Sequence, residues 1–190
     1  MAHLIYTTNM SLDGYIEDRD GKFDWTDPSE EVFRFITNLI RADGTHLYGR
    51  RTYESMMVWE TNPNLAGECP LMREFAQVWQ AGDKIVYSRT LEAVSTRKTQ
   101  IEQNFDPETI RRLKESVERD IHIGGAELAA QAFRSGLIDE CHLFIKPIIV
   151  GGGKAALPDN VRLELELLDE RRFGNGVVYL RYRTRQVRAT

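Results

Sequence analysis

Short apolar runs alternate along this chain with longer segments in which apolar residues recur every three or four positions. The short runs predict strands, and the longer segments predict amphipathic helices. The predicted strands are Leu4–Asn9, His46–Tyr48, Lys84–Tyr87, Ile121–Ile123, Ile138–Val150, Leu163–Leu168 and Val177–Tyr182. The predicted helices begin near Pro28, Thr52, Pro70, Asp106 and Gly125. Proline is favoured in the first turn of a helix, and its presence at or near several of these positions supports the predicted helix starts.

The polar segments between these elements predict turns and loops. Trp59–Cys69, which carries asparagine, proline and glycine, is the clearest loop, and Ser95–Gln103 is expected to be a solvated loop with a short edge strand. Gly174–Gly176 predicts a hairpin turn between the last two strands. Gly151–Lys154 does not complete a nucleoside triphosphate loop, because Ala155 stands where a hydroxyl is required, and it predicts a turn instead.

Together the elements predict an α/β fold in a single domain that spans residues 1–190. Strands alternate with helices over the first two thirds of the chain, which favours a mostly parallel sheet flanked by helices. The last strands are joined by short turns, which favours an antiparallel C-terminal edge on a mixed sheet. A chain of 190 residues is long enough to bury a full core without disulfides or metals.

Composition and charge narrow the classes of partner. The formal net charge is −4 and 42% of the residues are hydrophobic, so the charge balance gives no reason to expect nucleic acid. No apolar run is long enough for a membrane helix, and the N-terminus enters a strand pattern instead of a signal peptide, so a cytoplasmic protein is expected. Cys69 and Cys141 are expected to be reduced, and the histidines lack zinc-site spacing, so no metal is expected.

The segment Ile121–Phe133 carries the most informative chemical pattern, a β-branched run that breaks at Gly124 and Gly125 and continues as a helix. Backbone N–H groups at such a turn point outward beside the positive end of the helix dipole, where a phosphate would bind well. The same glycines are also consistent with a tight turn packed against a neighbouring segment.

Two further strand ends carry side chains that recognise phosphate. Gly49–Thr52 contains two arginines and a threonine, and Ser88–Thr90 contains an arginine between two hydroxyls. Arginine and small hydroxyl groups bind phosphate oxygens. Taken singly, each arginine fits a solvated charge or an ion pair better than a ligand contact. Because the carboxyl ends of parallel strands share one sheet edge, the three patterns together predict a nucleotide or dinucleotide site.

The motifs SLDGYI, GRRTYE, YSRTL and IGGAELAAQAF occur in this order, and with them the chain resembles the dihydrofolate reductase superfamily. It is most similar to the reductase domain of the bacterial riboflavin-biosynthesis deaminase-reductase and to stand-alone relatives of that domain. The resemblance extends from Leu4 to about Arg183. It implies a dihydrofolate-reductase-like fold, NADPH as the cofactor, a small heterocyclic substrate and, by analogy with relatives, a homodimer.

The resemblance also implies where the cofactor binds. The residues implied on its adenosine and 2′-phosphate side are Gly49, Arg50, Arg51, Thr52, Ser88, Arg89 and Thr90. The residues implied at its pyrophosphate are Gly124, Gly125, Ala126 and Glu127. Asn9 and Ile16, which flank the first turn, are implied to approach the nicotinamide.

The catalytic side of the resemblance depends on carboxylates. Trp25–Glu30 reproduces the W-x-x-P-x-acid spacing with which dihydrofolate reductases place a proton-delivering carboxylate, so Glu30, or Glu31 beside it, is the candidate. An acidic residue in the first turn of a helix is also favoured by the helix dipole alone. Asp13 is a further candidate contact to substrate or cofactor, although an Asp–Gly pair also forms turns.

The preferred hypothesis is an NADPH-dependent reductase that passes hydride to a C=N or C=O bond of a pterin-, pyrimidine- or similar heterocyclic substrate. The chain departs from the riboflavin enzymes at Asn62–Gly67, which lacks the acid and the arginine of their substrate-gripping segment. The pathway therefore stays open between riboflavin, folate and neither. A non-catalytic NADP-binding module is the alternative, and a Rossmann-type dehydrogenase is disfavoured because Gly124–Gly125 does not extend to G-x-G-x-x-G.

Overall fold

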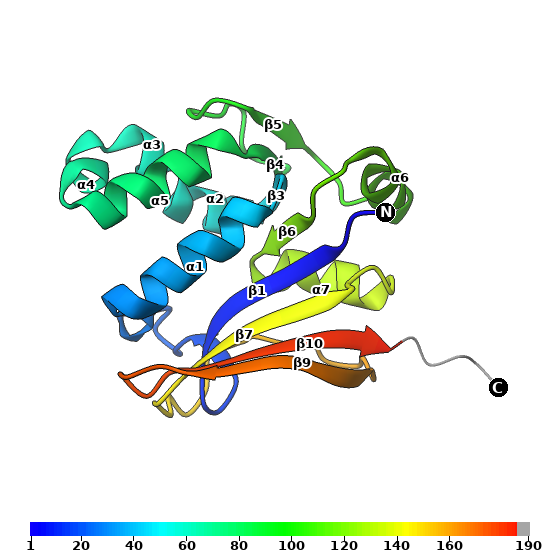
Figure 1. Ribbon diagram of the computed structural model, residues 1–190. Coiled ribbons are helices and arrows are strands. Elements are labelled where there is room, and N and C mark those ends of the chain that lie inside the picture. The colour runs from blue at the N-terminus through cyan, green and yellow to red at the C-terminus, as the bar shows by residue number, and fades with distance from the viewer. Residues whose placement is uncertain (186–190) are drawn as a thin grey trace.

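A computed structural model describes residues 1–185 (Figure 1). The strands are β1 Leu4–Ser11, β2 Tyr15–Glu17, β3 Thr45–Gly49, β4 Asp83–Tyr87, β5 Thr99–Glu102, β6 Ile121–Gly124, β7 Glu140–Lys146, β8 Lys154–Ala155, β9 Glu164–Arg172 and β10 Val178–Arg185. The helices are α1 Glu30–Ala42, α2 Arg50–Met56, α3 Val58–Thr61, α4 Pro63–Gly67, α5 Pro70–Ala81, α6 Pro107–Ser116 and α7 Ala126–Arg134, preceded by a 3₁₀ turn, η1, at Asp24–Thr26. Within residues 1–185, no helix is long and apolar enough to cross a membrane.

The main sheet has eight strands in the order β5-β4-β3-β6-β1-β7-β10-β9. The six strands from β5 to β7 pair in parallel, and β10 and β9 add antiparallel pairs at the far edge. Parallel neighbours require long crossovers, and helices form most of these connections. The predicted α/β class, with a mostly parallel mixed sheet and an antiparallel C-terminal edge, is therefore confirmed.

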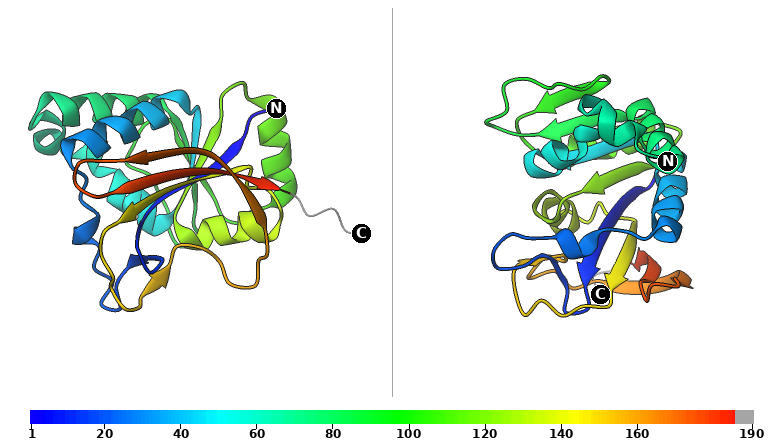
Figure 2. Two further views of the ribbon diagram at one scale, coloured as in Figure 1. Left: turned by 60° about the horizontal axis from the view of Figure 1, so that its bottom comes forward. Right: turned by 90° about the vertical axis from the view of Figure 1, so that its left-hand side faces the viewer.

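Helices cover both faces of the sheet (Figure 1 and Figure 2). The core between the sheet and the α6–α7 face contains Leu47 of β3 and Leu128 of α7. On the opposite face, Tyr48 of β3 packs into a second core with Phe75 and Trp79 of α5. Leu47 and Tyr48 are consecutive in one strand, so their side chains point to opposite faces and join different cores.

Several sequence predictions differ from the structure, among them the strand predicted at Ile138–Val150, which as β7 covers only Glu140–Lys146 and ends before Pro147. The predicted loop Trp59–Cys69 contains most of α3 and all of α4. Asn62 accepts the backbone N–H groups of Asn64 and Leu65, and Pro63 occupies the first helical turn, so residues typical of loops act here as a helix start. The strand predicted at Leu163–Leu168 continues to Arg172 as β9, where charged residues suit an exposed edge strand.

The carboxyl ends of β4, β3, β6, β1 and β7 lie in this order along one edge of the sheet. The short β2–β8 ribbon forms a second, two-stranded sheet. Gly151, Gly152 and Gly153 all have positive φ, which confirms the predicted turn after β7. A side chain at Gly153 would overlap the backbone of β2, so glycine permits this close approach.

Candidate functional site

Two of the predicted phosphate-binding runs meet at the ends of β3 and β4. Arg50, the first residue of α2, donates from Nη1 to Thr90 Oγ1 at 2.9 Å and from Nε to Glu54 Oε1 at 2.7 Å. Ser88 Oγ accepts the backbone N–H of Thr90 at 3.2 Å and so closes the turn after β4. The hydroxyls and the guanidinium of the two runs are therefore brought together at one place on the sheet edge.

Arg89 and Arg51 differ in their partners at this edge. Arg51 Nη1 lies 3.8 Å from Glu17 Oε1, which loosely links α2 to β2. The Arg89 side chain is exposed, and within residues 1–185 its guanidinium takes part in no ion pair or hydrogen bond. The donors of Arg89 are therefore free for an anionic ligand.

The glycine pair lies where β6 passes into α7. Gly125 has φ +94° and immediately precedes α7. A Cβ at Gly125 would lie 2.6 Å from Thr52 Oγ1, and a Cβ at Gly124 would lie 3.2 Å from the Tyr48 ring. The turn is thus packed tightly against α2, as one of the two sequence interpretations requires. It also leaves the first amides of α7 at the sheet edge, since a helix does not satisfy them internally.

Glu127 in the first turn of α7 is joined to the β2–β8 ribbon. Lys154 Nζ lies 2.6 Å from Glu127 Oε1 and 3.9 Å from Glu17 Oε1. The hydrogen bond from Lys154 holds the pKa of Glu127 below its ordinary value. An open cavity of about 510 Å³ lies beside this pair. Its lining residues are Glu17, Asp18, Arg19, Gly21, Gly153 and Lys154.

Asn9 and Ile16 flank the first turn, as the sequence predicts. Asn9 is near the carboxyl end of β1, and within residues 1–185 its buried Oδ1 has no hydrogen-bond partner. Ile16 in β2 is half-buried and packs against the main core. An unpaired buried polar atom costs free energy, so Asn9 is better explained if a ligand completes its hydrogen bonding.

Glu30 and Glu31 both begin α1, but they face different partners. Glu30 is exposed and pairs with Arg34 one turn later, at 2.7 Å. Glu31 accepts Arg171 at 2.9 Å and the backbone N–H of Gly174 at 3.2 Å, so it links α1 to the β9–β10 hairpin. The Gly174 bond and the Arg171 bond hold the pKa of Glu31 below its ordinary value, which keeps this carboxyl ionised.

Asp13 connects the first turn to the glycine turn after β7. Its carboxylate accepts the backbone N–H groups of Val150 at 3.2 Å and Gly151 at 2.8 Å. The Ser11 hydroxyl, with these backbone groups, holds the pKa of Asp13 below its ordinary value. The contacts of Asp13 are those of a turn-forming residue that fixes two loops beside the sheet edge.

Two buried polar groups in this region were not predicted as site residues. Lys146 ends β7 and is only 3% exposed. Trp25 lies in η1, and within residues 1–185 its buried Nε1 has no hydrogen-bond partner. The sequence pattern that could have indicated Lys146 as a site residue is a lysine at the end of a continuous apolar strand. Trp25 belongs to the W-x-x-P-x-acid motif, from which only the acid was selected.

Comparison with known proteins identifies the family to which this chain is similar. Residues 2–179 match the RibD C-terminal domain family. The uncharacterized protein YyaP of Bacillus subtilis (strain 168) is 30% identical over 181 residues, which cover 94% of this chain and 93% of YyaP.

Two solved structures have the same fold. A putative riboflavin biosynthesis protein from Shewanella sp. PV-4 superposes with a TM-score of 0.76 at 21% identity, over 98% of this chain and 100% of that chain. A diaminohydroxyphosphoribosylaminopyrimidine deaminase/5-amino-6-(5-phosphoribosylamino)uracil reductase from Thermotoga maritima gives a TM-score of 0.65 at 18% identity, over 96% of this chain and 56% of that chain. With the family match over almost the whole chain, these findings show that the chain belongs to the RibD C-terminal domain family, within the dihydrofolate reductase superfamily.

Proposed function

We propose that this chain is an NADPH-dependent reductase that transfers hydride to a pyrimidine- or pterin-like heterocycle. The observation that carries the proposal is the sequence of chemical groups along the sheet edge. In the described part of the chain, an arginine without an ion pair follows β4, the glycine turn follows β6, and an amide with an unpaired oxygen lies near the end of β1. An extended dinucleotide presents its 2′-phosphate, pyrophosphate and nicotinamide in the same order.

Each part of the cofactor has candidate residues in this chain. Arg89, with the run Gly49–Thr52 and the hydroxyls of Ser88 and Thr90, would hold the 2′-phosphate and adenosine. The turn Gly124–Glu127 would hold the pyrophosphate through backbone amides. Asn9 and Ile16 would border the nicotinamide. When bound, NADPH supplies the hydride, and the protein contributes the alignment of the two rings.

Reduction of a C=N or C=O bond also consumes a proton, for which Glu30, Glu31, Asp13 and water are the candidate sources. Glu31 and Asp13 are each held by backbone N–H groups of a neighbouring turn, which lower the pKa of both carboxyls and engage them in fixing the fold. Within residues 1–185, Glu30 has one ion pair, which is exposed, so we propose Glu30, or water held near it, as the proton source.

The experiment that tests this function follows the loss of NADPH absorbance with dihydrofolate, a dihydropterin and an aminopyrimidine riboside. We expect turnover with at least one of them. Glu30→Gln should then lower kcat while the Kd for NADPH stays close to that of the parent, and Glu31→Gln serves as the matched comparison. Tight NADPH binding without turnover of any substrate would favour the non-catalytic module. A cytoplasmic homodimer stays a prediction of the family resemblance.

A further inference from the structure

We propose that Lys146 binds substrate, and that it donates hydrogen bonds to a ring carbonyl oxygen of a lactam heterocycle. This inference rests on the proposed function and adds a residue that would recognise a ring oxygen of the substrate. It concerns the region where the carboxyl ends of β1 and β7 meet the η1 segment that leads into α1.

The Lys146 ammonium is buried with little compensation. Nζ donates to the backbone carbonyl of Asp27 at 3.4 Å, a long hydrogen bond. Within residues 1–185, no carboxylate oxygen lies within 4.0 Å of Nζ. An ammonium has three donors, so two remain unused. Burial lowers the pKa of Lys146 from its ordinary value, and the smaller, opposite effect of the Asp27 charge does not reverse this.

The strand register places Lys146 on the same face of the sheet as Asn9. Lys146 pairs with Ser11 of β1, and Asn9 pairs with Phe144 of β7. Residues two apart in a strand share a face, and paired residues of parallel strands do so as well. Phe144 packs edge-on against Phe35 of α1, with ring centroids 6.1 Å apart. Lys146 and Asn9 therefore both lie on the α1 face, at the carboxyl end of the sheet.

Trp25 adds a second unused donor to this region. Asp27, which accepts the Lys146 bond, directly follows η1, so the segment that carries Trp25 lies next to Lys146. Trp25 Nε1 is buried without a partner in the described residues, as is Asn9 Oδ1. Asn9 can turn its carboxamide to donate or accept, whereas Lys146 and Trp25 can only donate.

The matching ligand must present acceptors to these two donors. A lactam ring, as in uracil or an oxidised pterin, presents carbonyl oxygens as acceptors and ring N–H groups that Asn9 can accept. A ring with amino groups in place of its carbonyls would present donors to Lys146 and Trp25, which leaves both unpaired and is disfavoured. The site is therefore expected to discriminate between the two kinds of ring.

A structural role for Lys146 gives a different expectation. One hydrogen bond of 3.4 Å contributes less than the desolvation of a buried ammonium costs. If the charge is kept for binding, its removal should leave the fold as stable as before or more stable. If it is kept to hold Asp27, its removal should destabilise the protein and weaken every ligand equally.

The test compares diaminouracil, which has two ring carbonyls, with tetraaminopyrimidine, in which amino groups replace them. Binding of each probe is measured by calorimetry with NADP⁺ present, and NADP⁺ binding is measured separately. We expect the parent to bind diaminouracil at least roughly tenfold more tightly than tetraaminopyrimidine. Lys146→Met should weaken diaminouracil binding by roughly tenfold to a hundredfold, the range for a hydrogen bond to a charged group. It should leave tetraaminopyrimidine binding and the melting temperature undiminished.

Lys98→Met, which removes an exposed lysine beside β5, is the matched control and should change neither affinity. Three results would overturn the inference: a parent that does not bind diaminouracil, a Lys146→Met variant that keeps the parent's preference, or equal losses for both probes with a lower melting temperature. If NADP⁺ binds normally in those cases, the proposed function stands without the inference. If NADP⁺ does not bind the parent, the proposed function itself fails.

Discussion

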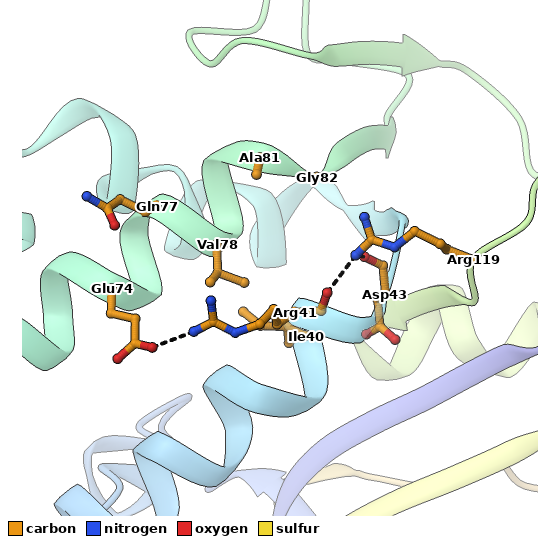
Figure 3. A pocket seen from close by; sticks show the side chains of 9 residues that line it. All are labelled: Ile40, Arg41, Asp43, Glu74, Gln77, Val78, Ala81, Gly82 and Arg119. Atoms are coloured by element: carbon orange, nitrogen blue, oxygen red, sulfur yellow. Dashed lines mark hydrogen bonds and ion pairs between the residues drawn. The ribbon is translucent and has the colours of Figure 1, made fainter.

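Charged residues lie near a cavity both at the amino ends and at the carboxyl ends of β3, β4 and β6. The two groups of charged residues differ in how many of them have hydrogen-bond or ion-pair partners. At the amino ends, a cavity of about 310 Å³ lies between the last turns of α1 and α5 (Figure 3). Arg119 donates to the carbonyls of Arg41, Ala42 and Asp43, which are the free acceptors at the end of α1. Arg41 pairs with Glu74 across the cavity. These charged groups satisfy one another or the backbone, whereas in the described residues the Asp43 carboxylate has no ion pair and the buried His46 Nε2 beside Gly82 has no hydrogen-bond partner.

At the carboxyl ends, several polar groups are left without partners in the described residues. Arg89 is exposed without an ion pair, Lys146 has one long hydrogen bond, and the polar atoms of Asn9 and Trp25 are buried unpaired. A cavity with charged walls is therefore a poor guide to function in this molecule. In the described residues, more unused hydrogen-bonding capacity lies at the end that is expected to bind ligands than at the end that stabilises helix α1.

Among the variants that test this comparison, the largest effect on NADPH binding is expected at Gly125. Gly125→Val would place a branched side chain against Thr52 and into the turn that is proposed to hold the pyrophosphate. Several charge-assisted hydrogen bonds would be lost together, each contributing about 1.5–3 kcal/mol, so NADPH binding should fall roughly a hundredfold or more. The Kd for NADPH is measured by fluorescence, with folding checked by circular dichroism.

Gly136→Val is the matched control for this variant. Gly136 follows the other end of α7, also has positive φ, and has open space where a Cβ would stand. It should share the backbone strain and the loss of stability without the loss of NADPH binding. Equal NADPH affinity in the parent and in a folded Gly125→Val variant would show that the turn at Gly124–Glu127 does not hold the pyrophosphate.

A smaller effect is expected at Arg89. Arg89→Ala should weaken NADPH binding by roughly tenfold to a hundredfold, because a charge-assisted hydrogen bond to the 2′-phosphate is lost. NADH binding should hardly change, and the salt dependence of NADPH binding should decrease. Arg41→Ala removes an arginine from the opposite end of the sheet and should leave both affinities unchanged. A variant at Arg89 that loses both cofactors alike would contradict this assignment.

The smallest effect concerns stability at the amino ends. Burial, with the neighbouring Asp120 charge, raises the pKa of Asp43 to about 7. The unfolded carboxyl has an ordinary, lower pKa, so the folded protein loses stability as the pH rises from about 4 to about 7. Asp43→Asn should therefore raise the melting temperature above pH 7 and have little effect near pH 4. A gain of about 1 kcal/mol corresponds to roughly 2–4 °C for a domain of this size. A constant difference across this pH range would refute the explanation.

The sequence predicts the fold, which the structure confirms, and the candidate phosphate-binding strand ends, which stay a prediction, because both depend on local patterns. The break at Gly124 and Gly125 and the arginine-hydroxyl runs are visible in short segments, and parallel pairing brings such ends together. The partners of Glu31 are distant in sequence, since Arg171 and Gly174 lie in the β9–β10 hairpin. In the sequence, Lys146 belongs to an apolar segment that predicts a strand and gives no sign of a site. Only the register between β7 and β1 shows that Lys146 lies on the same face of the sheet as Asn9.

The most direct test of the comparison is a titration of the parent protein with NADPH, followed by the NMR signals of its backbone amides. We predict saturable shifts at the carboxyl end of the sheet, at Gly49, Ser88 and Gly125, and unchanged signals around the cavity of Figure 3, at Asp43, Gly82 and Arg119. Shifts concentrated at the amino end, or no saturable shifts, would contradict the assignment of the strand ends as the cofactor site.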